Sequence, residues 1–117
     1  MAKVISTEEL KKKIDEGGDF HLINVLTPES FTAMHIPKSV NIPVADKFLE
    51  NIEKADISKD AEIIVYCSSV TCQASVQAAS LLEQAGYTNV THYADGLAGW
   101  KNAGYQFEGV AAEQMSQ

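Results

Sequence analysis

The sequence contains no arginine, and its nine basic residues, all lysines, face sixteen aspartates and glutamates for a net charge of −7. Guanidinium groups bind phosphate-like oxyanions through two parallel hydrogen bonds, so chemistry that depends on such bidentate binding is excluded here. The negative charge also disfavours nucleic acids and anionic membranes as partners, because both are recognised by basic surfaces.

Long hydrophobic runs are also missing. No stretch approaches the ~18 apolar residues that a membrane-spanning helix needs. Residues 1–13 hold no apolar segment followed by a small-residue cleavage site, so we expect no signal peptide and a cytoplasmic location with reduced thiols. The length of 117 residues, 45% of them hydrophobic, predicts one globular domain with its own core.

Cysteines are few, and both of them, Cys67 and Cys72, lie in one short segment. In a reducing compartment we expect no structural disulfide, and the short loop between them would restrict the unfolded chain little. A zinc site needs four ligands, and His21, His35 and His92 do not show metal-type spacing. We therefore expect no metal and no cofactor.

Capping signals and apolar periodicity predict strands alternating with helices. Ser6 and Glu9 form a capping-box pattern that opens a helix to about Asp15, and the apolar run 62–66 is typical of a central parallel strand. Further strands are predicted at 20–25, 39–43 and 90–93, and further helices at 45–54, 72–85, 97–103 and from Pro28. This alternation predicts an α/β fold with a mostly parallel sheet covered on both faces.

Cys67 follows the predicted central strand directly, and a helix begins a few residues later. In open α/β sheets, ligands bind beyond the carboxyl ends of the strands. Backbone N–H groups of such a turn, together with the helix N-terminus, favour a thiolate and would stabilise an anionic persulfide. A strand-end cysteine can equally be an inert apolar residue, so position alone leaves both interpretations open.

Several segments resemble the rhodanese-like family, in the same order along the chain. They are residues 22–25, the His-Ile-Pro-Lys-Ser-Val-Asn-Ile-Pro stretch at 35–43, the stretch 64–67 that ends at Cys67, and residues 85–90 and 96–100. The resemblance covers about residues 4–107, leaving 108–117 as a polar tail. It implies a three-layer rhodanese-like domain with a central five-stranded, mostly parallel sheet, and a catalytic role for Cys67.

The loop after Cys67 departs from the usual family pattern, in which basic residues flank the cysteine and an arginine ends the loop. Here the predicted substrate-binding loop carries no cation and consists of Ser68, Ser69, Val70, Thr71, Cys72 and Gln73. It resembles a less common subgroup with a Cys-x4-Cys loop, about two residues longer than the commonest form. Phosphatases and arsenate reductases of this fold rely on an arginine where Gln73 stands, so the sequence strongly disfavours those activities.

Other positions also differ from the family pattern. Asn24 and Leu26 stand where an Asp–Arg pair is common, which neutral groups can replace with little harm. Asp95 replaces a glycine and puts a carboxylate near the expected pocket mouth. His35 is interpreted as a structural histidine, and Ser75 as a local hydrogen-bonding residue because the sequence places no base beside it.

Two functions of different classes stay open. The first is a sulfurtransferase or sulfur carrier, in which Cys67 takes sulfur from a persulfide or thiosulfate donor and passes it to a thiol or protein acceptor. Thiosulfate turnover should be weak because the loop lacks cations, and Cys72 is the candidate resolving thiol. The second is a non-catalytic rhodanese-like interaction or regulatory module.

Overall fold

The protein forms one five-stranded sheet in the computed structural model, which describes residues 3–45, 47–68 and 73–110. The strand order is β1-β5-β4-β2-β3, and all pairs are parallel. The strands are β1 (Lys3–Val4), β2 (His21–Asn24), β3 (Ser39–Asn41), β4 (Ile63–Tyr66) and β5 (Val90–Tyr93). The helices are α1 (Thr7–Glu16), α2 (Pro28–Ala33), α3 (Phe48–Lys54), α4 (Ala74–Gln84) and α5 (Gly96–Asn102). The predicted α/β architecture is confirmed.

Helix ends follow the local chemistry of the sequence. The Ser6 side chain accepts a hydrogen bond from the Glu9 backbone N–H in a complete capping box, and Pro28 opens α2 as predicted. The start of α3 was predicted at residue 45, which is too early. Lys47 has a φ of 50°, a left-handed conformation outside the helical region, so α3 begins at Phe48.

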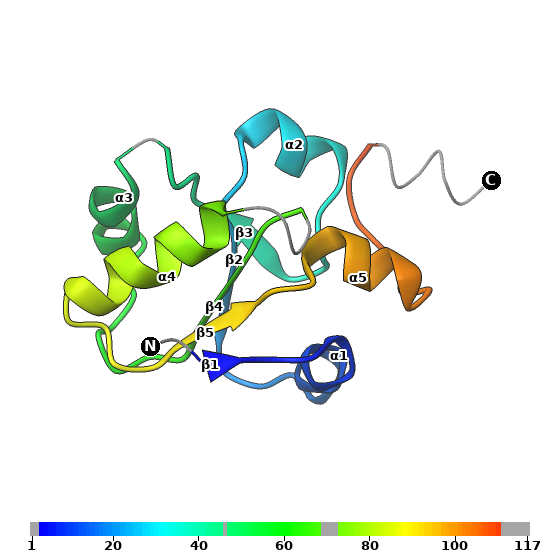
Figure 1. The fold of residues 1–117 in the computed structure, drawn as a ribbon, viewed down its shortest axis with the longest axis horizontal. Coiled ribbons are helices and arrows are strands. Elements are labelled where there is room, and N and C mark those ends of the chain that lie inside the picture. The colour runs from blue at the N-terminus through cyan, green and yellow to red at the C-terminus, as the bar shows by residue number, and fades with distance from the viewer. Residues whose placement is uncertain (1–2, 46, 69–72, 111–117) are drawn as a thin grey trace.

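The helices cover the sheet on both faces, with α3 and α4 on one side and α1 and α5 on the other (Figure 1). Side chains alternate along a strand, so Ile23 and Val65 enter the first core while Leu22 and Ile64 enter the second. All four residues of β4 are buried, as expected of a central strand. Within the described part of the chain, no helix has both the length and the apolar character to cross a membrane.

Tyr66, the last residue of β4, connects three segments through its hydroxyl. The hydroxyl donates to Ser39 Oγ at 2.9 Å and accepts from Asn24 Nδ2 and from the Ile36 backbone N–H, each at 3.1 Å. Burial raises the pKa of Tyr66, so the phenol keeps its hydrogen. Asn24 therefore serves as a neutral partner inside the fold, and its Oδ1 also accepts from the Leu26 N–H.

His35 joins the C-terminal part of the chain to α2. Its ring stacks on Phe31 with centroids 3.9 Å apart, and its backbone exchanges hydrogen bonds of 2.8 and 2.9 Å with Glu108. These contacts are those of the structural histidine expected from the sequence. The packed structure thus continues past residue 107, where the polar tail was predicted to follow the core.

Replacing Tyr66 by phenylalanine should lower the free energy of unfolding by about 2–4 kcal/mol, because Asn24 Nδ2 and the Ile36 N–H lose a buried acceptor. Urea denaturation measures the change. Tyr87→Phe is the matched control, since Tyr87 is also buried and its ring contact with the Lys59 ammonium does not involve the hydroxyl. Equal losses in the two variants would contradict this role for the Tyr66 hydroxyl.

Candidate functional site

Cys67 lies one residue beyond β4 and is 1% exposed. Its carbonyl oxygen accepts a hydrogen bond of 3.0 Å from the Leu97 N–H, and the Ser68 carbonyl accepts one of 2.8 Å from the Ala98 N–H. Both donors belong to the first turn of α5. The first turn of α5 therefore holds the beginning of the predicted substrate-binding loop.

The predicted loop is described only at its two ends. Ser68 and Gln73 are exposed, whereas Ser69, Val70, Thr71 and Cys72 lie outside the described residues. Cys67 is disulfide-bonded in this structure, so the expectation of a chain without a disulfide is not met, and the form seen here is oxidised at its sulfur. The roles of Cys72 as a resolving thiol and of residues 69–72 in binding substrate stay predictions.

Two side chains from other elements meet at the sulfur of Cys67. Ser75, in the first turn of α4, places its Oγ 3.3 Å from Cys67 Sγ. The same oxygen lies 2.7 Å from Nε2 of His92 on β5. The register of β4 and β5 pairs Val65 with His92, which sets His92 on the sheet face that α4 covers. A continuous chain of polar atoms thus runs from sulfur to hydroxyl to imidazole.

The interpretation that no base lies beside Ser75 is wrong, because His92 is within hydrogen-bond distance of its hydroxyl. On α4, Ser75 and Ala79 are buried together with Ala78 and Leu82. Positions 75, 78, 79 and 82 follow helical spacing, so this signal could have placed Ser75 on the inner face. The partnership with His92 needs the strand register, which local patterns do not supply.

The environment of His92 favours a neutral imidazole. Burial lowers the pKa of His92 below its ordinary value of 6.5. A neutral imidazole has one nitrogen that donates a hydrogen bond and one that accepts. The 2.7 Å contact with Ser75 can therefore run in either direction, with Nε2 as donor or as acceptor.

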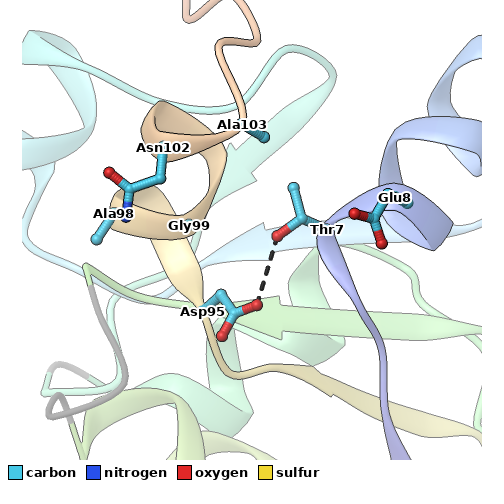
Figure 2. A pocket seen from close by; sticks show the side chains of 7 residues that line it. All are labelled: Thr7, Glu8, Asp95, Ala98, Gly99, Asn102 and Ala103. Atoms are coloured by element: carbon cyan, nitrogen blue, oxygen red, sulfur yellow. Dashed lines mark hydrogen bonds between the residues drawn. The ribbon is translucent and has the colours of Figure 1, made fainter.

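A separate pocket of about 470 Å³ lies between α1 and α5 (Figure 2). Its described lining residues are Thr7, Glu8, Asp95, Ala98, Gly99, Asn102 and Ala103. Thr7 Oγ1 donates a hydrogen bond of 3.4 Å to Asp95 Oδ2, and the same Oγ1 lies 2.6 Å from the Tyr93 hydroxyl. Two carboxylates in this lining disfavour an anionic ligand. The pocket meets the cysteine segment through Ala98, whose N–H holds the Ser68 carbonyl.

Within the described ranges, no group of three or more histidine, cysteine, aspartate or glutamate side chains is arranged to hold a metal ion. His21, His35 and His92 belong to different parts of the fold. His35 packs on α2, and His92 contacts Ser75.

Comparison with known proteins gives a consistent result. A family model described as the rhodanese-like domain matches residues 6–103. A "Sulfurtransferase" of Allochromatium vinosum is 29% identical over 104 residues, which are 89% of this chain and 92% of that protein. The "HTH-type transcriptional regulator Rv0324" of Mycobacterium tuberculosis is 32% identical over 89 residues, which are 76% of this chain but only 38% of that protein.

The fold also matches solved structures. The rhodanese-like domain of the Alr3790 protein from Anabaena superimposes with a TM-score of 0.81 at 27% sequence identity. The superposition covers 95% of this chain and 82% of that one. The three-layer architecture expected from the sequence resemblance is therefore confirmed.

The pKa of His92 predicts a dependence of stability on pH. In the unfolded chain the imidazole binds a proton more readily than in the folded protein, so acid favours unfolding. The contribution of neutral His92 is fully present above about pH 6.5 and is lost as the pH falls through the lowered folded pKa. In urea denaturation between about pH 7.5 and about pH 5, His92→Gln should lose less stability than the parent protein. Parallel losses in the two proteins would show that burial of His92 does not couple to folding.

Proposed function

The chain belongs to the family of rhodanese-like domains, and on that premise we propose that it is a sulfurtransferase or sulfur carrier that forms a persulfide on Cys67. The observation that carries the proposal is the position of Cys67, at the end of the central strand with a hydroxyl 3.3 Å from its sulfur. The similarity to the sulfurtransferase of Allochromatium vinosum supports the same function.

The proposed reaction begins from the reduced form of Cys67. The thiolate attacks the outer sulfur of a persulfide donor, R–S–SH, and forms the new bond of Cys67–S–SH. The S–S bond of the donor breaks, and its electron pair leaves with the thiolate R–S⁻. An acceptor thiolate then attacks the outer sulfur of the Cys67 persulfide and regenerates the Cys67 thiolate. No net oxidation occurs in either step.

Persulfides of proteins or small molecules are the proposed donors, in preference to thiosulfate. Thiosulfate is a dianion, and residues 67–73 contain no cation to bind it. A hydrogen bond to a charged partner contributes about 1.5–3 kcal/mol, so the missing basic groups should weaken thiosulfate binding substantially. A persulfide donor needs less positive charge in residues 67–73 than thiosulfate does.

Cys72 is proposed as a resolving thiol. Its thiolate would attack the inner sulfur of the Cys67 persulfide, forming a Cys67–Cys72 disulfide and releasing the outer sulfur as hydrosulfide. A thiol reductant would then be needed to restore both thiols. We also propose a cytoplasmic location, and the reducing cytoplasm would supply such thiols.

A regulatory or interaction module is the second candidate function. The similarity to a transcriptional regulator favours it, although this chain spans little more than a third of that regulator's length. In such a module Cys67 would serve as a docking point or would not be used. Sulfur transfer by Cys67 is the property that separates the two candidates.

Intact mass after incubation with a persulfide donor tests the sulfurtransferase proposal. The reduced Cys72→Ser variant, which has no resolving thiol, should gain the mass of one sulfur atom, because the Cys67 thiolate at the end of β4 becomes a persulfide. Cys67→Ser should show no such gain, and the parent should lose the added sulfur again as the Cys67–Cys72 disulfide forms. No gain with several chemically different donors would remove the carrier function and favour the regulatory module.

Thiosulfate and cyanide test the predicted donor preference. Thiocyanate should form at least tenfold more slowly from thiosulfate than from a persulfide donor at equal concentration, because about 1.4 kcal/mol of lost binding already gives that factor. Colorimetric detection of thiocyanate measures both rates, with Cys67→Ser as the blank. Rapid turnover of thiosulfate would show that the cation-free loop does not limit this substrate.

A further inference from the structure

The contacts of Ser75 and His92 have no role in the sulfur-transfer steps described so far. Ser75 is 1% exposed and contacts both Cys67 Sγ and His92 Nε2, at 3.3 and 2.7 Å. Its hydroxyl has a single hydrogen, so it can donate to only one of these two neighbours at a time. When the Ser75 hydroxyl donates to Cys67 Sγ, it favours the thiolate. When it donates to His92, its oxygen can accept from the Cys67 thiol.

We propose that Ser75 and His92 form a relay that takes up the proton of the Cys67 thiol and then holds the resulting thiolate with a hydrogen bond from the Ser75 hydroxyl. The inference rests on the proposed function, since it concerns how the same sulfur becomes a nucleophile. Ser75 acts on the sulfur directly, and His92 is a positioning residue that acts through Ser75.

The proton moves in two coupled transfers within this chain. In the thiol form, the S–H of Cys67 donates to Ser75 Oγ, and the Ser75 O–H donates to Nε2 of His92. The thiol proton passes to Oγ while the original hydroxyl proton passes to Nε2, so the products are a thiolate and an imidazolium. The imidazolium then loses the proton on Nδ1 to water. The final chain runs from Nε2–H to Oγ and from O–H to the thiolate.

The surroundings of His92 fit this task. Its register neighbours are Val65 on β4 and Val4 on β1, and Ser75 contacts it from α4, so these three elements present apolar or hydroxyl side chains. Cys67, at the far end of Ser75, is the titratable group in the same chain of contacts. Burial lowers the pKa of His92, which makes the imidazolium short-lived and favours release of the proton. His92 is less buried than Cys67, so the chain leads from the core toward the surface.

The test measures the pH at which Cys67 becomes reactive, with no sulfur donor present. In a Cys72→Ser background Cys67 is the only cysteine, and the rate of its alkylation follows the thiolate fraction. Ser75→Ala should raise the pH midpoint by about one unit, a tenfold loss of thiolate at neutral pH. His92→Phe should raise it by a smaller amount, and His92→Gln should restore most of the reactivity because its amide N–H can donate to Ser75.

Additivity distinguishes a relay from separate effects. Because His92 acts through Ser75, adding His92→Phe to Ser75→Ala should cause no further shift. Thr91→Val is the matched control, since Thr91 is buried on the same strand but pairs with Ile64, whose side chain enters the other core. Its midpoint should equal that of the parent. An unchanged midpoint in Ser75→Ala, or fully additive shifts, would overturn the relay.

Nitrogen NMR of the parent protein removes any dependence on how the variants fold. With Cys67 reduced and ionised, His92 should carry its hydrogen on Nε2, and the opposite tautomer would overturn the proposal. The relay and the sulfurtransferase proposal can each be rejected without rejecting the other. Shifted midpoints without sulfur uptake would keep the relay and reject the sulfurtransferase, whereas sulfur uptake with unmoved midpoints would do the reverse.

Discussion

The parallel register between β4 and β5 is the constraint on which the site depends. It pairs Val65 with His92, so His92 shares a sheet face with the helix that carries Ser75. Because side chains alternate along a strand, a slip of one residue would turn His92 to the opposite face and bring Thr91 into its place. The same slip would turn Val90 and Tyr93 to the opposite cores, so burial on both faces of the sheet fixes the register firmly.

Sequence patterns predicted the elements whose causes are local. The capping box at Ser6, the proline at the start of α2 and the apolar run of β4 each act within a few residues, and each was found where expected. The two-residue strand β1 carries too short a pattern to be detected, since it exists through pairing with β5 almost ninety residues later. Position along the chain was also enough to put Cys67 at the carboxyl end of the central strand.

The rest of the site could not be found in this way. Ser75 and His92 are 17 residues apart in sequence, and neither has a motif that identifies the other. Their contact results from packing α4 on the sheet together with the pairing of two strands. The Tyr66 hydroxyl is similar, since its partners Asn24, Ile36 and Ser39 come from segments that only the folded sheet brings together.

The hydrogen bonds from α5 to the Cys67 and Ser68 carbonyls have a consequence for how loop length can vary among such domains. It anchors the loop at its beginning, next to the sulfur, and the other described end runs into α4 at Ala74. Residues gained or lost between these two points change the width of the loop without displacing the nucleophile from the end of β4. Loop length and cysteine placement are thus independent variables, and a longer loop can be accommodated on an unaltered sheet.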